Sequence, residues 1–316
     1  MSALGKLAYY SVFRPFWFCA RFFRHDGFVG TVIARREDAR MKEAALLLPP
    51  VAAPAPGPSY TAHYLTGAAF FGLSGFAAYS LQRHSAGQVA PVFHSDGRLD
   101  APTIAKLRGV FPTAGFVTDE EQRERLAAHL PPERFPALNR ARDELVTMRK
   151  LISGHLGRRG WNVFIDSDTL FWRSPGFLLD WYRQPSGAFC MQDNATAYGY
   201  DESLLTRLAG RPIPPKINVG LLGLRSESID WDFLEHCTRE LFATPSTKYF
   251  TEQALTALLL ARQPFCYAPP ADYFIPVRVE QCLSREGVFQ HYCGDARHWL
   301  YRRAWRLFQT TLESTR

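Results

Sequence analysis

The stretch "GWNVFIDSDTLFWRSP", Gly160 to Pro175, joins a strand-like apolar run directly to two carboxylates. Val163 to Ile165 are followed by Asp166-Ser167-Asp168, after which the chain becomes apolar again and reaches a proline. A short apolar run of this kind is typical of a strand buried on both faces of a parallel sheet. Residues two apart on a strand lie on the same face, so the two aspartates at its end can act on one ligand.

The aspartate pair indicates a divalent metal site. Carboxylate oxygens without a nearby thiolate suit a hard ion, Mg²⁺ or Mn²⁺, better than zinc or copper. Such an ion commonly completes its shell with substrate phosphates. The alternative interpretation is a solvated acidic turn after the strand.

Strand and helix patterns alternate from Tyr60 onward, which predicts an α/β fold with a mainly parallel central sheet and ligands at the carboxyl ends of its strands. "ARDELVTMRKLISGHL", residues 141–156, has apolar residues at helical spacing and predicts one helix. "KINVGLLGLRS", residues 216–226, predicts a strand broken at Gly220. Residues 28–46 predict a strand followed by a charged helix, and a Pro-rich linker ends at Ser59.

Composition limits the partners. The 316 residues include 37 Lys and Arg against 30 Asp and Glu, a formal charge of +7 that favours anionic partners such as phosphates, nucleotides or acidic lipids. No nucleic-acid-binding motif accompanies this charge, so no nucleic-acid partner is expected. The six cysteines form no C-x-x-C pair, so neither a zinc site nor a disulfide framework is predicted. The aromatic N-terminal segment is interrupted by arginines and Pro15, which argues against a membrane span.

The ordered motifs between about Tyr60 and Trp299 resemble the GT-A type of nucleotide-sugar glycosyltransferase, particularly the group that contains glycogenin and the bacterial lipopolysaccharide galactosyltransferases. The motifs are, in order, "HYLTG", "ELVTMRKLISGHL", "FIDSDTLFWRSP", "INVGLLGL", "TEQAL" and "QHYCGDARHWL". The resemblance implies a single Rossmann-like GT-A catalytic domain. We place it at residues 60–299, with an N-terminal extension and linker at 1–59 and a basic aromatic C-terminal helix at 300–316.

In that family two aspartates and a late histidine hold a divalent ion on the donor diphosphate, which assigns Asp166, Asp168 and His291 as metal ligands. The late motif has the form H-x-x-G-x-x-[KR]-x-W, so the resemblance also implies substrate contacts for Gly294 and Arg297, with His298 where the family usually has proline. A histidine nitrogen favours Mn²⁺ over Mg²⁺.

Charge on the leaving diphosphate needs a cation as well as a metal. Arg149, Lys150 and Arg297 are the candidates. Consecutive helical residues do not face the same way, so one of Arg149 and Lys150 is expected at the surface. We favour Lys150 slightly for the site.

Further site residues follow from the remaining motifs. By the resemblance, Asn218 and Gly220 contact the donor sugar, although a simple bulge at Gly220 is the alternative. Glu252 and Gln253 are expected to line the sugar or acceptor site and to serve catalysis, whereas Glu252 could equally cap a helix. The third predicted catalytic residue, Asp193, would bind sugar hydroxyls unless it only forms an Asx turn. Thr66 ends the opening strand and is a predicted substrate contact.

The expected function is metal-dependent transfer of a sugar, a hexose by preference and with retention of configuration, from a nucleotide-diphosphate sugar to a saccharide or glycolipid. A haloacid-dehalogenase-like phosphatase is an alternative, but Thr169 comes one position too early for its motif. A non-catalytic, membrane-associated sugar-nucleotide-binding protein is the other alternative.

The basic, aromatic C-terminal tail suggests a location in the cytoplasm, with possible peripheral contact to an anionic membrane. Its apolar positions could lie in the membrane interface or dock on the catalytic domain. We favour docking.

Overall fold

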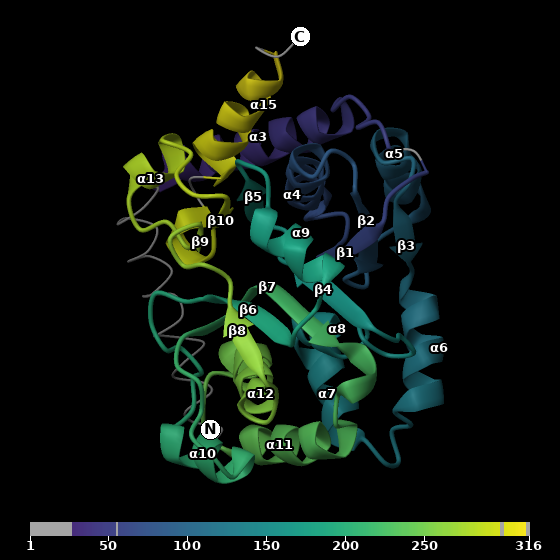
Figure 1. The fold of residues 1–316 in the computed structure, drawn as a ribbon, viewed down its shortest axis with the longest axis vertical. Coiled ribbons are helices and arrows are strands. Elements are labelled where there is room, and N and C mark those ends of the chain that lie inside the picture. The colour runs from purple at the N-terminus through teal and green to yellow at the C-terminus, as the bar shows by residue number, and fades with distance from the viewer. Residues whose placement is uncertain (1–26, 55, 298–299, 314–316) are drawn as a thin grey trace.

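The computed structural model describes residues 27–54, 56–297 and 300–313 (Figure 1). The strands are β1 Tyr60–Thr66, β2 Val89–Ser95, β3 Gly115–Val117, β4 Trp161–Ile165, β5 Thr169–Phe171, β6 Ala188–Gln192, β7 Ile217–Arg225, β8 Phe265–Tyr267, β9 Tyr273–Phe274 and β10 Phe289–His291. The helices are α3 Gly27–Leu46, α4 Phe71–His84, α5 Ala101–Val110, α6 Asp119–His129, α7 Pro136–Glu144, α8 Met148–Leu151, α9 Gly176–Arg183, α10 Glu202–Ala209, α11 Trp231–Ala243, α12 Thr251–Ala261, α13 Val279–Leu283 and α15 Trp305–Glu313. Short helical turns are η3 Ser226–Ser228, η4 Lys248–Phe250, η5 Gly294–Ala296 and the π-helical η6 Leu300–Ala304.

Seven strands form the central sheet in the order β3-β2-β1-β4-β7-β6-β8. Only β7 runs antiparallel to its neighbours, so the predicted mainly parallel α/β sheet is confirmed. A second, three-stranded sheet has the order β5-β10-β9. In it His291 of β10 pairs with Thr169 of β5, which places the histidine beside the end of the Asp166–Asp168 segment.

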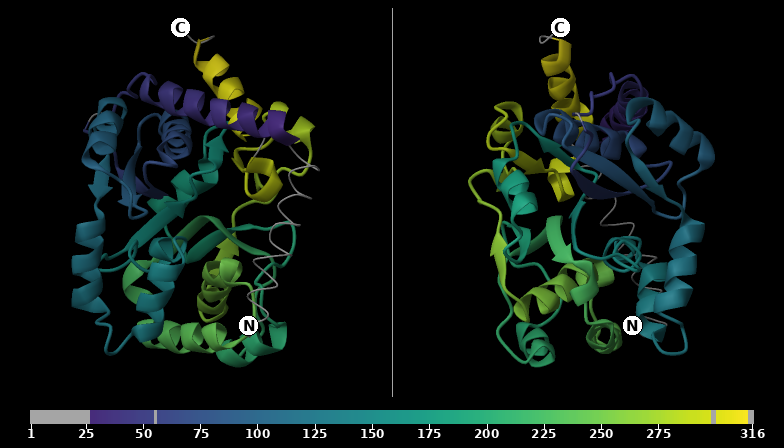
Figure 2. Two further views of the ribbon diagram at one scale, coloured as in Figure 1. Left: turned by 180° about the vertical axis from the view of Figure 1, so that it is seen from behind. Right: turned by 45° about the vertical axis from the view of Figure 1, so that its right-hand side comes forward.

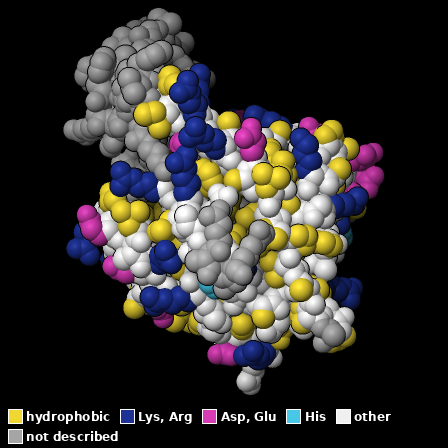
Figure 3. Space-filling model, turned by 90° about the horizontal axis from the view of Figure 1, so that it is seen from above, with side chains coloured by type: hydrophobic (Ala, Val, Ile, Leu, Met, Phe, Trp, Pro, Cys, Tyr) yellow, Lys and Arg dark blue, Asp and Glu magenta, His cyan; other side chains and the backbone are white. Residues whose placement is uncertain are grey.

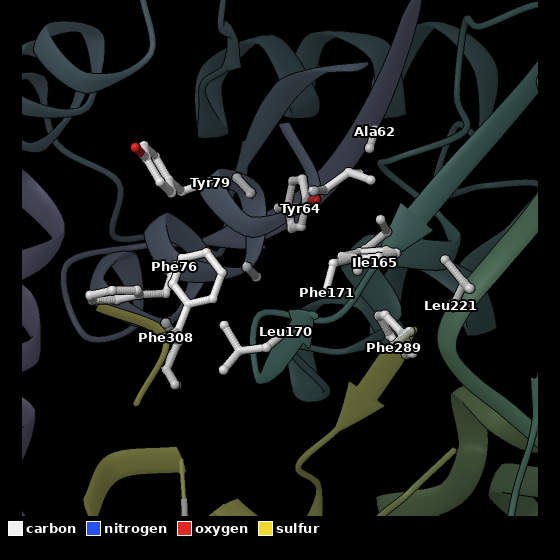
Figure 4. Packing of buried hydrophobic residues seen from close by; sticks show 14 of the residues in the cluster. Ala62, Tyr64, Phe76, Tyr79, Ile165, Leu170, Phe171, Leu221, Phe289 and Phe308 are labelled. Atoms are coloured by element: carbon white, nitrogen blue, oxygen red, sulfur yellow. The ribbon is translucent and has the colours of Figure 1, made fainter. Parts of the chain in front are cut away.

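Apolar residues cover both faces of the central sheet. Alternate side chains of a strand point to opposite faces, and accordingly Leu221 and Leu222 belong to two different core clusters. Figure 4 shows part of the first cluster, where Tyr64 and Ile165 of the central sheet lie near Phe171 and Phe289 of the small sheet. This shared core fixes the small sheet, and with it His291, against the central one.

The predicted strand at the start of residues 28–46 is wrong, because helix α3 begins at Gly27 and continues to Leu46. Its buried side chains Glu37, Met41 and Ala45 recur every four residues, which is helical spacing. Ala45 packs closely on α4, where a Cβ at Gly75 would lie 3.2 Å from the Ala45 Cβ. Packing against α4 therefore outweighs the strand preference of the β-branched residues at the start of this segment.

The single helix predicted over residues 141–156 is also wrong. Helix α7 ends at Glu144, Leu145 has extended backbone angles, and only Met148–Leu151 returns to helix as α8. Beyond it, Gly154 lies against Phe164, and a Cβ there would come within 2.5 Å of that ring. The break turns α8 so that two consecutive basic residues, Arg149 and Lys150, are both buried.

The strand break predicted at Gly220 occurs against only one neighbour. Strand β7 is continuous and pairs with β4 through Leu221. Its register with β6 shifts, because Cys190 pairs with Leu222 whereas the next residue, Met191, pairs with Asn218. The irregularity thus lies opposite β6, at the end of the sheet where the two aspartates emerge.

The C-terminal helices dock on the body of the protein. Leu300, Ala304, Trp305 and Phe308 are buried, and the Phe308 ring packs against rings of α4 and against Trp172. Both views in Figure 2 place α15 beside α3, and Arg306 Nη2 lies 2.6 Å from Glu37 Oε1 of α3. The apolar face of the tail is therefore used in packing, as we favoured.

The end of the molecule formed by α3 and α15 carries Lys and Arg side chains among hydrophobic and acidic ones (Figure 3). Among the described residues no helix combines the length and apolar character needed to cross a bilayer. The aromatic N-terminal segment considered above lies mostly within residues 1–26, outside the described residues.

Candidate active site

The structure brings Asp166, Asp168 and His291 together. One potential ligand atom from each lies within 4.8 Å of the other two. His291 Nε2 is 3.5 Å from Asp166 Oδ2 and 3.3 Å from Asp168 Oδ1. The aspartates follow β4 and the histidine ends β10, so the cluster depends on the pairing of β10 with β5.

A cation holds the second oxygen of each aspartate. Lys150 Nζ donates to Asp166 Oδ1 at 2.6 Å, and Arg297 donates from Nε and Nη2 to Asp168 Oδ2 at 2.9 and 2.6 Å. Each carboxylate therefore turns its other oxygen toward His291. This set of two oriented carboxylate oxygens and one imidazole nitrogen fits a divalent metal ion.

The side chain of Asn218 orients His291. Asn218 Oδ1 accepts from the Gly220 backbone N–H at 2.8 Å and lies 3.1 Å from His291 Nδ1. Because an amide oxygen only accepts, the Nδ1 atom carries a proton, and Nε2 is the ring nitrogen that faces the aspartates and is available to a metal ion. A Cβ at Gly220 would lie 2.2 Å from His291 Nδ1, so only glycine allows the imidazole to lie here.

The cluster is electrostatically coupled. Burial lowers the pKa of His291, but contact with Asp168 and the charge of Asp166 outweigh burial and raise that pKa above its usual value. Burial raises the pKa of Asp168, yet His291 and Arg297 outweigh it and hold the pKa well below its usual range. Metal binding by His291 therefore displaces a proton that the aspartates otherwise retain.

Lys150 links the cluster to Glu252. Its ammonium group lies 3.0 Å from Glu252 Oε1 and donates to the Val219 carbonyl at 3.0 Å. Burial, followed by the charge of Asp166, raises the pKa of Glu252 to about 7 although Lys150 opposes the shift. The N-cap of α12 is Phe250, and Glu252 lies in the first turn of the helix, where its contact with Lys150 favours the site interpretation.

Asp193 and Gln253 form the next part of the site. Asp193 Oδ2 accepts from Asn218 Nδ2 at 2.8 Å and from Gln253 Nε2 at 3.4 Å. Its other oxygen makes a long Asx-type contact of 3.5 Å with the Ala195 backbone N–H. The Asx turn and the site contacts are thus both present, and Asn218 joins Asp193 to His291.

Thr66 and Gly294 lie at two further edges of the site. Ser74 Oγ lies 2.7 Å from Thr66 Oγ1 and 2.9 Å from the hydroxyl of Ser167, which stands between the two aspartates. Gly294 has φ +57° and is exposed in the turn that follows His291. This left-handed turn leads the chain to Arg297.

Arg149 is not at the surface, so the expectation that one of Arg149 and Lys150 is solvated is wrong. Its guanidinium pairs with Asp119 of α6 and lies beside Gly97, where a Cβ would be 3.2 Å from Nη2. Arg149 therefore lies near the carboxyl end of β2, apart from the Asp166 contacts of Lys150.

The sequence analysis did not single out the carboxylates of Asp119 and Asp96. Asp119 pairs with Arg149, and Asp96, which is buried, follows β2 and lies against Gly67, where a Cβ would be 2.0 Å from Asp96 Oδ1. The only sequence signal for Asp96 was its position after a strand, in the segment "VFHSDG". Nothing in the sequence identified Asp119 as the partner of Arg149.

Neither a protein-family model nor a curated protein sequence matches the chain. Solved structures share its fold. The WbbM bifunctional glycosyltransferase matches at 12% identity and TM-score 0.50, over 80% of this chain and 51% of that one. The galactosyltransferase LgtC, solved with donor and acceptor sugar analogues, matches at 15% identity and TM-score 0.50, over 79% and 95%. Mouse xyloside xylosyltransferase 1 matches at 11% identity and TM-score 0.50, over 76% and 98%.

The chain therefore spans about half the length of WbbM and nearly all of LgtC and the mouse enzyme. All three are named glycosyltransferases, and the GT-A fold predicted by the sequence resemblance is confirmed.

Proposed function

We propose that this chain is a metal-dependent glycosyltransferase that moves a sugar from a nucleotide-diphosphate sugar to a saccharide or lipid-linked saccharide. The main support for this proposal is the arrangement of the two aspartates. One oxygen of each aspartate faces His291, and the other is held by Lys150 or Arg297. The shared fold favours transfer over the phosphatase alternative. The donor and acceptor analogues bound to LgtC support the same two substrate classes.

A divalent ion held by Asp166, Asp168 and His291 would neutralise charge on the donor diphosphate. The imidazole ligand favours Mn²⁺ over Mg²⁺. Lys150 is buried and fixed between two carboxylates, so its contribution is to orient Asp166. The Arg297 side chain is 42% exposed, which leaves this planar, multi-donor group accessible to a phosphate as well as to Asp168.

The Asp193–Gln253 side of the site would receive the sugars. Asn218 and Gln253 orient Asp193 through their amide groups, and the remaining lone pairs of the carboxylate can accept from sugar hydroxyls. Gly220 contributes indirectly, because the His291 imidazole fills the space that a side chain at this position would take. Transfer of a hexose with retention of configuration is the outcome we expect from the sequence resemblance.

The proposed setting is synthesis of a polysaccharide or lipopolysaccharide in the cytoplasm, with the acceptor presented at the inner face of the membrane. The Lys and Arg side chains at the end of the molecule formed by α3 and α15 support this setting only through their charge. Docking of the tail leaves the buried Phe308 unavailable for insertion into the bilayer.

A panel of UDP-, GDP-, dTDP- and ADP-sugars, each tested with Mn²⁺, Mg²⁺ or EDTA, tests the proposal. We expect at least one nucleotide sugar to raise the melting temperature only with metal, because ligands that bind the folded state stabilise it. The same donor should release its nucleoside diphosphate more slowly in water than with a saccharide acceptor. If no donor in the panel binds or reacts in the presence of either metal, the proposed function is wrong.

A further inference from the structure

A cavity of about 560 Å³ lies between the segment that follows β6 and the segment that joins α11 to α12. Its walls come from residues 196–202 and 244–246, together with Ile213 and Pro215. The volume lies within the range of about 300–1,000 Å³ found for small-molecule sites. None of the three metal-cluster residues lines the cavity, so it is separate from that cluster.

Hydrogen bonds connect the wall of the cavity to the start of α12. The Ala197 carbonyl accepts from Gln253 Nε2 at 3.1 Å, and the Tyr200 hydroxyl lies 2.9 Å from Thr251 Oγ1. The wall segment also begins at Thr196, soon after Asp193, to which Gln253 donates as well. The cavity therefore adjoins the Asp193–Gln253 side of the candidate active site.

The segment between α11 and α12 makes a second connection. Its residues 244–246 line the cavity, and Tyr249 of the same segment is 67% exposed. Ser246 donates to the Gly199 carbonyl, and Gly199 lies against Phe250, so this segment joins the opposite wall of the cavity next to the start of α12.

The chemistry of the lining selects the ligand. Among the residues that the structure describes, the lining contains the carboxylates of Asp201 and Glu202, hydroxyl groups such as that of Thr196, and two tyrosines, but no Lys, Arg or His. Within the described part of the chain neither carboxylate forms an ion pair. The lining therefore disfavours phosphates and nucleotides, whereas carboxylates accept hydrogen bonds from hydroxyls and tyrosine rings pack against apolar faces.

We infer that this cavity binds a neutral sugar unit of the acceptor, at least one unit away from the sugar that receives the transferred residue. The inference rests on the proposed function, and it makes the acceptor an oligosaccharide or glycan chain rather than a free monosaccharide. A binding measurement that needs no turnover separates the failure of one proposal from the failure of the other.

Saturation-transfer NMR on the full chain tests the inference with neutral sugars. The probes are maltotriose, cellotriose and triacetylchitotriose, each beside its own monosaccharide, with the cationic chitosan trisaccharide as a comparison. We expect at least one trisaccharide to bind about tenfold more tightly than its monosaccharide. Ser246→Trp, which fills the cavity, should abolish that advantage, and Ser228→Trp on η3, outside the cavity, should keep it.

The double variant Asp201→Asn, Glu202→Gln keeps the shape of the cavity. It tests whether the cavity binds the trisaccharide if Ser246→Trp does not fold. It should weaken trisaccharide binding about tenfold, because hydrogen bonds to charged acceptors are lost. Three results would overturn the inference: no trisaccharide binds better than its monosaccharide, both cavity variants bind it as the wild type does, or only the cationic chitosan trisaccharide binds. Nucleotide-sugar turnover by the wild-type chain tests the proposed function separately.

Discussion

Asn218 and His291 are joined by a 3.1 Å contact between Oδ1 and Nδ1, and the same amide oxygen accepts from the Gly220 N–H at 2.8 Å. The Asn218 side chain thereby holds a proton on Nδ1 of the proposed metal ligand and stabilises the part of β7 where the register with β6 shifts. Through its Nδ2 atom it also holds Asp193. The orientation of both the metal side and the sugar side of the site therefore depends on Asn218.

Asn218→Ala should weaken Mn²⁺ binding by about 10- to 100-fold, because groups that orient metal ligands typically contribute that much to affinity. Isothermal titration with Mn²⁺ measures the change. Asn139→Ala, which removes an amide from the α7 region that bonds only to backbone carbonyls, is the matched control. Equal Mn²⁺ affinity in the wild type and Asn218→Ala would show that Asn218 does not orient the ligand.

Lys150→Met should destabilise the fold by about 3–5 kcal/mol, because it leaves the buried carboxylate of Glu252 beside that of Asp166. Glu252 already has a pKa of about 7 with Lys150 present, so it can take up a proton as the pH falls. The deficit in the free energy of unfolding should therefore be smaller at about pH 5.5 than at about pH 8.

Urea unfolding of Lys150→Met with and without Glu252→Gln checks this account, and Lys106→Met on the exposed face of α5 serves as the control. Glu252→Gln should restore part of the lost stability. A deficit that is independent of pH and of Glu252 would mean that Lys150 stabilises the fold by packing alone.

The histidines His63, His94 and His155 surround the Phe164 ring behind the site and predict a loss of stability in acid. Burial lowers the pKa of His155 to about 3 and lowers those of His63 and His94 well below the usual value. The unfolded chain takes up protons below about pH 6.5 while the folded chain does not, so stability falls as the pH falls.

Each such histidine costs about 1.6 kcal/mol between pH 6.5 and 5. His155→Gln, which keeps a polar partner for Ser226, should reduce the wild-type loss by that amount in urea unfolding at the two pH values. If the variant and the wild type lose equal stability, His155 is not held neutral in the folded chain.

The sequence predicted the central features of the site because the two aspartates come directly after a strand and the other site residues lie in motifs of a fixed order. Asp166 and Asp168 follow a strand that is buried on both faces, as their apolar flank indicated. The break between α7 and α8 could not be predicted, because residues 141–156 keep helical spacing and the break depends on tertiary burial of Arg149 and Lys150. The pairing of β10 with β5, which places His291 beside the aspartates, also joins segments far apart in the sequence. The domain limits at 59 and 299 stay predictions.

The same reasoning explains the helix at α3. Its first residues favour a strand locally, and the packing of α3 on α4, including Ala45 against Gly75, specifies the helix. The role of Asp119 could not be predicted for a related reason, because its partner Arg149 is 30 residues away in the sequence.

Phe308→Ala tests the docking of the C-terminal helix. Removal of a buried phenylalanine should destabilise the protein by about 3–5 kcal/mol in urea unfolding. Pelleting with anionic vesicles at low salt, compared with neutral vesicles, should not change. A variant of unaltered stability that loses vesicle binding would instead place Phe308 at a membrane surface.

The most direct test of the metal site compares wild-type protein with Asp168→Asn in Mn²⁺-dependent release of nucleoside diphosphate from the donor that the panel identifies. The substitution keeps the shape of the side chain but removes the charge that faces His291 and pairs with Arg297. We predict that Asp168→Asn stays folded by thermal melting and loses at least about 99% of the metal-dependent rate, equivalent to roughly 3 kcal/mol of transition-state stabilisation. Turnover by Asp168→Asn at the wild-type rate, or an equal wild-type rate in EDTA, would contradict the assignment of Asp166, Asp168 and His291 as the metal site.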